Sequence, residues 1–116
     1  MNSQEPRRGE VWWVRLDPTQ GSEIKKTRPC VILSHDTLNR LRQTVVVVPL
    51  STAAGAHPPI TIPVTCQSKK GVAVIDQIRA IAKHRLQTRI EIMPAEELAE
   101  ISRALGQVLQ LVGTKG

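Results

Sequence analysis

Residues 44–50, with the sequence TVVVVPL, constrain the fold of this chain more than any other segment. Four consecutive valines are restricted at χ1 in a helix, and Pro49 lacks the amide hydrogen that a helix interior requires. A run of this kind is typical of a strand at the centre of a sheet. We therefore expect a central β-strand here, whose end brings Ser51 and Thr52 to a loop.

Several further segments place β-branched residues between turn residues, which is the pattern of short strands. The apolar run of 28–35 predicts burial on both faces, Pro63 indicates an edge strand, and 71–82 is either one strand or two with a bend near Asp76. The predicted connections are a loop at 19–27, a helical turn at 36–41 with Asp36 as its candidate cap, and a basic turn at 68–71. The predicted strands are 9–17, 28–35, 44–50, 60–65, 71–82 and 89–93.

One long helix is expected over residues 94–112, with Pro94 in its first turn and Gly113 as its stop. Its apolar residues recur every three or four positions, and we expect this stripe to pack on the sheet rather than on a second subunit. Many short strands followed by a helix predict a mainly β (α+β) fold, a small antiparallel barrel or strongly bent sheet. With 116 residues, we expect one domain over 1–116, with its core at about 7–112.

The charge of the chain indicates a polyanionic partner. Lys and Arg number 16 against 10 Asp and Glu, a net charge of +6, and 14 basic and 7 acidic residues precede residue 94. Clustered cations favour RNA, DNA or an acidic protein segment, because binding releases counterions and charge accelerates encounter. The alternative is that the excess charge only keeps a small domain soluble.

Absent residue types exclude several classes of protein. The chain has no Phe or Tyr, and its only aromatic residues are Trp12 and Trp13, so modules that stack several bases on aromatic side chains fit poorly. We expect both tryptophans to be buried, one in the barrel and one under the helix or at a subunit interface. Cys30 and Cys66 show neither zinc nor disulfide spacing and are interpreted as small buried apolar residues. No segment predicts a secretory signal or a membrane span, so we expect a cytoplasmic protein.

The best candidate for phosphate chemistry is Arg28, in the segment GSEIKKTRPCVILS at 21–34. Pro29 ties this arginine to the start of a buried strand, and a guanidinium on a fixed stem holds a phosphate through two parallel hydrogen bonds. Lys25 and Lys26, in the preceding loop, would add diffuse attraction. The alternative for Arg28 is a structural salt bridge at a strand end.

Three blocks of the sequence, RGEVWWVRLDPTQGSEIKKTRPCVILS, VVVVPLST and GVAVIDQIRAIAKHRL, resemble the MazF/PemK (Kid) toxins of bacterial toxin–antitoxin systems. The resemblance covers about residues 7–112, with the blocks in the same order. It implies an SH3-like barrel shared with the CcdB fold, a homodimer, and an endoribonuclease that cleaves single-stranded RNA without metal or cofactor. It also implies an antitoxin partner, whose acidic tail we expect in the RNA groove.

The resemblance also implies roles for individual residues. Arg28 matches the arginine of the family's RP step and is the catalytic candidate. Ser51 falls where the family often has Thr, and because Thr52 follows directly, either hydroxyl is a candidate for the phosphate contact. Glu23 matches the acidic residue of the family's GSE segment. The matching DQIR-like block and the basic segments give the RNA-binding candidates Lys25, Lys26, Lys69, Lys70, Asp76, Gln77 and Arg79.

Metal-independent RNA cleavage uses the 2′-OH of the substrate as nucleophile and needs a base, an acid and a cation for the phosphorane. Arg28 suits chiefly the cationic role and is also a candidate acid, and Glu23 or Asp76 is the candidate base. Two alternatives stay open. One is a gyrase-binding toxin on the same barrel, with its functional patch at 109–116, and the other is an RNA-binding relative without activity.

Overall fold

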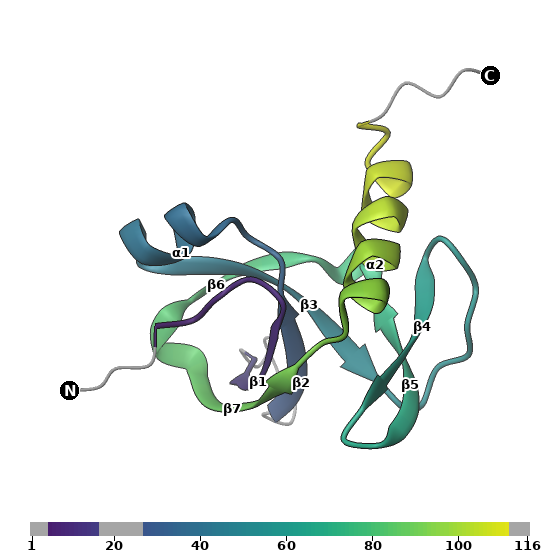
Figure 1. Cartoon of the computed structure of the whole chain (residues 1–116), viewed down its shortest axis with the longest axis horizontal. Helices are drawn as coiled ribbons and strands as arrows, with labels where there is room; N and C mark the ends of the chain where they lie inside the picture. Colours follow the sequence, from purple (N-terminus) through teal and green to yellow (C-terminus); the bar gives the residue numbers. More distant parts are fainter. Residues whose placement is uncertain (1–4, 17–26, 112–116) are drawn as a thin grey trace, which may run out of the picture.

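The computed structural model describes residues 5–16 and 27–111 as a curled antiparallel sheet with two α-helices (Figure 1). The strand order is β4-β5-β3-β2-β1-β7, and β6 pairs with β3 outside this path. This arrangement confirms the predicted mainly β fold with a C-terminal helix. In chain order the elements are β1 (Glu10–Arg15), β2 (Thr27–Ile32), α1 (Asp36–Leu41), β3 (Thr44–Ser51), β4 (Thr61–Cys66), β5 (Lys69–Val74), η1 (Ile75–Gln77), β6 (Arg79–Ala82), η2 (Lys83–Arg85), β7 (Leu86–Ile92) and α2 (Ala95–Val108).

Strand β3 is the centre of the sheet, as its valine run predicts. Val47 pairs with Ile32 of β2 and with Arg79 of β6, so β3 has a neighbour along each edge. The last residues of β3, Leu50 and Ser51, pair with β5. Strands β5 and β6 therefore follow successive parts of β3, and the 3-10 turn η1 between them is the predicted bend.

Alternating side chains of the strands form two buried clusters, on opposite faces of the sheet. The cluster under α2 includes Ile101 and Ala104 of that helix, and Leu98, Leu105 and Val108 pack against it, which confirms that the apolar stripe faces the sheet. The cluster on the other face consists of Trp12, Val14, Cys30, Ile32, Val45, Val47 and Ile81. Figure 1 shows α2 standing between the curled sheet and the β4–β5 hairpin, and the helix contacts β4 and η1.

The cap of α1 differs from the prediction. His35 is the N-cap, because its Nδ1 accepts a hydrogen bond of 3.0 Å from the backbone N–H of Thr37. The Asp36 carboxylate instead accepts hydrogen bonds from the backbone N–H of Arg8 (2.7 Å) and from Asn39 Nδ2 (3.0 Å). The bond from Arg8 lowers the pKa of Asp36. Asp36 therefore attaches the N-terminal segment to α1 rather than capping the helix.

The turn predicted at 68–71 is shorter and starts one residue earlier. Gln67 and Ser68 form it with positive φ angles of 53° and 65°, and Lys69 already belongs to β5. Such φ angles usually select Gly, Asn or Asp, so the residue types here gave little indication of the turn. The lysines are consequently strand residues instead of turn residues.

Strand β4 is an edge strand, as Pro63 predicts, because it stands at one end of the strand order. Two carboxylates bind backbone N–H groups near its end. Glu97 of α2 accepts from Thr65, with its nearer oxygen at 3.1 Å, and Glu91 of β7 accepts from Gln67 at 3.1 Å. These bonds tie the β4–β5 hairpin to the helix and to the opposite end of the sheet.

Helix α2 ends at Val108, earlier than the predicted 112, and Gly113 lies outside the described residues. Gln110 adopts a positive φ of 55°, and the backbone N–H of Leu111 bonds to the carbonyl of Gly106 at 2.8 Å. This bond closes the helix end without glycine at the left-handed position. Among the described helices, none has the length and apolar character needed to cross a bilayer.

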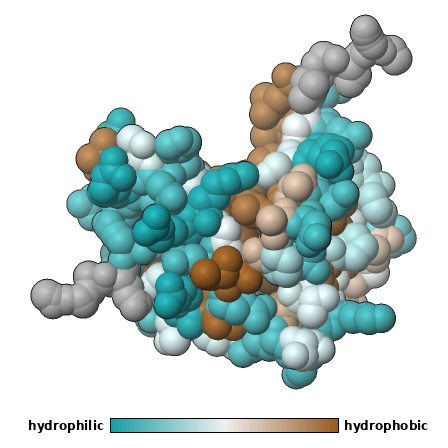
Figure 2. Space-filling view, viewed as in Figure 1, coloured by the Kyte–Doolittle hydropathy of each residue, from teal (hydrophilic) through white to brown (hydrophobic). Residues whose placement is uncertain are grey.

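Exposed apolar residues are spread over separate elements. Leu41 of α1, Ile92 of β7 and Leu111 after α2 are each about 70% exposed, at 69, 68 and 71%. Figure 2 shows brown apolar areas separated by hydrophilic surface on the face that it presents. That face is therefore mainly hydrophilic.

Candidate active site

Arg28 stands on β2, opposite Val14 of β1 in the ladder and directly before Pro29. Its side chain is partly buried. Within residues 5–16 and 27–111 its guanidinium has no hydrogen bond or ion pair, so this part of the chain gives no support to a structural salt bridge. A positioned guanidinium that is unpaired within these ranges is suited to bind an anionic ligand.

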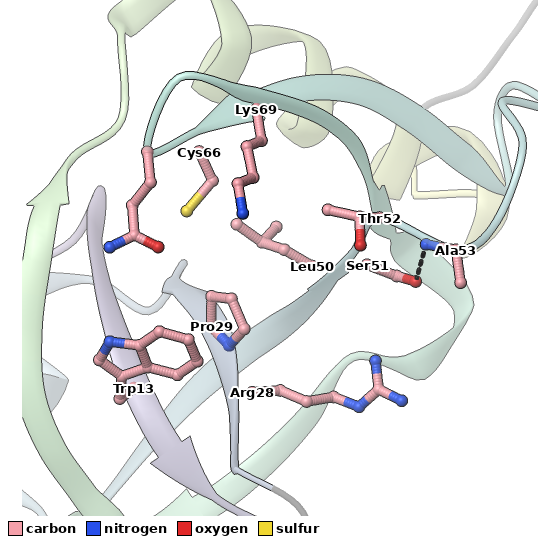
Figure 3. Close-up of a pocket in the computed structure, with 10 residues that line it drawn as sticks. Trp13, Arg28, Pro29, Leu50, Ser51, Thr52, Ala53, Cys66 and Lys69 are labelled. Atoms are coloured by element: carbon pink, nitrogen blue, oxygen red, sulfur yellow. Dashed lines mark hydrogen bonds between the residues drawn. The ribbon is translucent and has the colours of Figure 1, made fainter.

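Ser51 is the last residue of β3 and lies beside Arg28. Its Oγ accepts a hydrogen bond of 3.1 Å from the backbone N–H of Ala53, which fixes the hydroxyl at the start of the loop. The hydroxyl hydrogen can still donate to a ligand. Figure 3 shows the Ser51 hydroxyl and the Arg28 guanidinium at the same end of a pocket.

That pocket has a volume of about 280 Å³ and contains both apolar and polar groups. Figure 3 shows Trp13 and Pro29 on one side, with Lys69 and Cys66 extending from the β4–β5 hairpin on the other. Its complete lining is Trp13, Arg28, Pro29, Leu50, Ser51, Thr52, Ala53, Cys66, Gln67 and Lys69. We call it the hairpin pocket.

A second pocket, of about 270 Å³, is lined by Leu16, Arg28, Pro49, Ser51, Val74 and Gln77. We call it the η1 pocket, because Gln77 comes from that turn. The two pockets share Arg28 and Ser51, whereas Thr52 lines only the hairpin pocket. Arg28 and Ser51 therefore stand where the two pockets meet.

The two cysteines differ in burial and in the charges around them. Burial raises the pKa of the Cys30 thiol to about 12, although the positive charges of Arg79 and Arg28 act in the opposite direction. Burial, the Glu91 carboxylate and the charge of Glu97 raise the pKa of Cys66 to about 11. Both thiols are thus protonated at neutral pH and are weak nucleophiles.

Cys30 is fully buried and confirms the prediction for it, whereas Cys66 is only partly buried and lines the hairpin pocket. The charged groups that shift the pKa values of the two thiols also show where positive and negative charge lie around the site. Arg28 and Arg79 place positive charge near Cys30, and the carboxylates of Glu91 and Glu97 place negative charge near Cys66. An anion is consequently favoured at the Arg28 end.

Residues 7–109 match the family described as PemK-like, MazF-like toxin of type II toxin-antitoxin system. The chain belongs to this family. The match covers the strands, both helices and both pockets, and it confirms the resemblance that the three sequence blocks indicate.

Curated relatives and solved structures agree with this family. The chain is 37% identical to endoribonuclease MazF9 of Mycobacterium tuberculosis over 115 residues, covering 90% of this chain and 97% of that protein. It is 32% identical to endoribonuclease MazF of Staphylococcus epidermidis, covering 85 and 87%. A crystal structure of MazE-MazF (Form-II) from Deinococcus radiodurans superposes with a TM-score of 0.79 and 25% identity, covering 95% of this chain and all of that chain.

The predicted site residues of this PemK/MazF-like chain occupy different places. Arg28, Ser51, Thr52 and Lys69 meet at the hairpin pocket, and Gln77 lines the η1 pocket. Asp76, beside Gln77, is exposed, as is Arg79 on β6. Lys70 is exposed on β5 and lines neither pocket. The loop at 19–27 falls largely on residues that the structure leaves undescribed, so Glu23, Lys25 and Lys26 lie outside the described residues.

Trp13 is the site residue that sequence reasoning misses. Trp12 is buried, at 6% exposure, and donates to Glu10 Oε1, but Trp13 is only partly buried and lines the hairpin pocket. Trp12 is thus the tryptophan buried in the barrel, and burial of Trp13 at a subunit interface stays a prediction. Strand alternation places the two on opposite faces, but only the register of Trp13 with Pro29 brings its indole to the site.

Within the two described ranges, no three His, Cys, Asp or Glu side chains are grouped so that they could hold a metal ion. The polar groups of the site are instead a guanidinium, hydroxyls, an ammonium and amides. These groups bind and stabilise phosphate oxygens.

Proposed function

We propose that this family member is an endoribonuclease that cuts single-stranded RNA at a phosphate held by Arg28 and Ser51. The observation that carries the proposal is that these two residues are shared by the hairpin pocket and the η1 pocket. A nucleotide chain with its phosphate at this junction places one flanking nucleoside toward each pocket. The names of the curated relatives, both endoribonucleases, support the activity.

The chemistry that suits this site is attack by the neighbouring 2′-OH on the phosphorus. The new O–P bond forms as the bond to the 5′-oxygen breaks, and the leaving oxygen takes a proton from Arg28 acting as acid or from water. The products are a 2′,3′-cyclic phosphate and a 5′-OH. The guanidinium of Arg28 stabilises the negative charge of the phosphorane, and the Ser51 hydroxyl donates to one of its oxygens. Because the substrate supplies the nucleophile, we propose that the reaction needs no metal ion.

A base must remove the proton of the 2′-OH, and Glu23 and Asp76 are the two candidates. Asp76 is exposed and directly precedes Gln77 of the η1 pocket, so it lies close to one end of the proposed RNA path. Comparing Glu23→Gln with Asp76→Asn assigns the role. The variant that lacks the base loses kcat and also the rise of kcat with pH on the acidic side, whereas the other keeps that rise.

The proposed partners follow from the same groove. The family is that of toxins in two-component systems, and the Deinococcus structure pairs MazF with MazE. We propose that a cognate antitoxin places an acidic segment over Arg28 and Lys69, where it competes with RNA for the same cations. We further propose that the chain acts as one toxin domain over 1–116, in a cytoplasmic homodimer.

A second candidate function is binding of a protein target without catalysis, because two apolar residues are exposed at the end of α2. Leu109 is 48% exposed and Leu111 is 71% exposed. Under this alternative, Leu109→Ser combined with Leu111→Ser abolishes growth arrest and Arg28→Ala does not. The nuclease proposal requires the opposite result.

The decisive experiment incubates the purified chain with a long RNA in excess EDTA and maps the cut positions and both new ends. We expect cleavage with 2′,3′-cyclic phosphate and 5′-OH ends. Arg28→Ala should lower the rate by about 10²-fold or more while the protein stays folded. The matched control is Arg42→Ala, an exposed arginine that lines neither pocket. Dependence of cleavage on Mg²⁺, or equal losses in both variants, would refute the proposal.

A further inference from the structure

Gly71 of β5 lies against the backbone of Ser51. A Cβ atom at residue 71 would lie 2.6 Å from the carbonyl oxygen of Ser51, 3.3 Å from its carbonyl carbon and 3.5 Å from Thr52 Cα. Real Cβ atoms essentially never approach another heavy atom within 3.0 Å. The atom in conflict belongs to the backbone, so no side-chain rotation relieves the contact.

The need for glycine here comes from this close approach and not from backbone conformation. Gly9 has a positive φ of 91°, whereas Gly71 has no positive φ. An alanine at 71 would therefore be acceptable in every respect except its contact with Ser51. The side chain that glycine lacks is what allows β5 and the end of β3 to lie this close together.

The surroundings decide which strand would move if a methyl group were added. On its other edge, β5 pairs with β4 at Val64, and the neighbouring residues Val72 and Ala73 are buried at 3 and 0% exposure. Beyond Ser51, in contrast, the chain leaves the sheet and residues 52–57 are exposed. The added methyl group would therefore displace Ser51 and Thr52 rather than β5.

We infer that Gly71 is a positioning residue for the Ser51 hydroxyl. Because Gly71 has no Cβ, the Ser51 carbonyl can lie close to the backbone of β5. This close approach fixes the position of the Ser51 hydroxyl relative to Arg28. This inference rests on the proposed function, in which that hydroxyl donates to the phosphorane. Displacement by several tenths of an ångström affects the transition state more than substrate binding, because the hydroxyl must meet a specific oxygen.

The test compares Gly71→Ala with Gly55→Ala as a matched control, since a Cβ at Gly55 meets its nearest atom, His57 Nε2, at an ordinary 3.7 Å. Both are assayed for kcat and KM on a single-stranded RNA oligonucleotide that contains one mapped cut site. We expect Gly71→Ala to lower kcat by about 10-fold to 10²-fold with KM changed less than threefold. Gly55→Ala should stay within about twofold of the unsubstituted protein in both constants.

A double-mutant cycle with Ser51→Ala separates positioning of the hydroxyl from a general structural effect. If Gly71 acts through that hydroxyl, Gly71→Ala should lower kcat less than about threefold once the hydroxyl has been removed. Full additivity of the two losses, or a Gly71→Ala variant as active as Gly55→Ala, would overturn the inference. Failure of the proposed function looks different, because then the unsubstituted protein does not cleave RNA or Arg28→Ala does not impair it.

A second variant covers the case in which Gly71→Ala does not fold. Val72 pairs with Ser51 in the ladder, and Val72→Ala loosens the same strand pair without a clash. We expect Val72→Ala to lower kcat severalfold in the presence of the Ser51 hydroxyl and by less than twofold in its absence. An equal loss in both backgrounds would overturn the inference.

Discussion

Arg28 and Arg89 stand on the two strands that flank β1, yet they have opposite roles in the molecule. Arg89 of β7 is opposite Trp12, and Arg28 of β2 is opposite Val14. Arg89 Nη1 donates to the Glu10 carboxylate at 3.0 Å, whereas Arg28 has no such partner in the described chain and stands between two pockets. Arg89 is thus paired within the fold, whereas Arg28 is the arginine for which we propose an anionic ligand.

Glu10 explains the difference between these arginines. It is 4% exposed, and its oxygens also accept hydrogen bonds from the backbone N–H of Arg7 (3.0 Å) and from Trp12 Nε1 (2.9 Å). A buried carboxylate requires such partners, and together they join the N-terminal turn, β1 and β7. Arg28 has no counterpart of Glu10 among the described residues. Residue type alone therefore does not separate a structural arginine from a functional one.

The largest effect is expected at Arg28 when each arginine is replaced by lysine. This substitution keeps the positive charge but removes the planar guanidinium. Arg28→Lys should lower kcat by about 10²-fold, because an ammonium cannot hold two phosphoryl oxygens in the way a guanidinium does. Arg89→Lys should leave kcat within about twofold, since its partner is Glu10 and not the substrate. Single-turnover RNA cleavage measures both variants. If both lose activity to the same extent, the distinction between the two arginines is wrong.

A smaller effect, on stability instead of activity, is expected at Glu10. Glu10→Gln keeps the shape of the side chain but weakens hydrogen bonds from three donors, so the free energy of unfolding should fall by about 2 kcal/mol. Urea denaturation measures this change, and kcat of the folded fraction should not fall. The control is Glu100→Gln, whose pair with Arg103 is exposed on both sides and should contribute less than about 0.5 kcal/mol. A selective loss of kcat in Glu10→Gln would contradict a purely structural role.

The strands were predictable because their local chemistry leaves few choices. The valine run of β3 disfavours a helix, and Pro49 excludes one there. Pro63 restricts β4 to the edge of the sheet, because proline has no N–H to donate to a neighbouring strand. The errors occur where local chemistry permits several outcomes. Gln67 and Ser68 adopt positive φ angles in the hairpin turn although neither is Gly, Asn or Asp. Helix α2 ends at Val108, four residues before the predicted 112, through backbone hydrogen bonds that no residue type indicates.

The candidate site was predictable only where it depends on strand ends. Arg28 stands at the start of one apolar run and Ser51 at the end of another, and the family resemblance selects them from other basic and hydroxyl residues. Trp13, Leu50 and Gln67 come from three further places in the chain, and strand register alone brings them to one pocket. Register is set by packing over the whole sheet, so a single segment contains no signal for it.

The smallest effect is expected at two adjacent lysines of β5. They allow a second comparison, between a cation that lines a pocket and one that does not. Lys69 lines the hairpin pocket, and Lys70 does not, although both were RNA-binding candidates. If Lys69 contacts a phosphate, Lys69→Ala should raise KM severalfold and reduce the slope of log affinity against log salt by about 0.7, the value for one contact on a single strand. Lys70→Ala should leave this slope unchanged, because its ammonium lies outside the pocket and adds only screened attraction.

Binding titrations at several salt concentrations, with an RNA blocked at the cut site by 2′-O-methylation, measure both slopes. Equal slopes for the two variants would show that RNA follows the exposed face of β5 rather than the pocket beside Arg28.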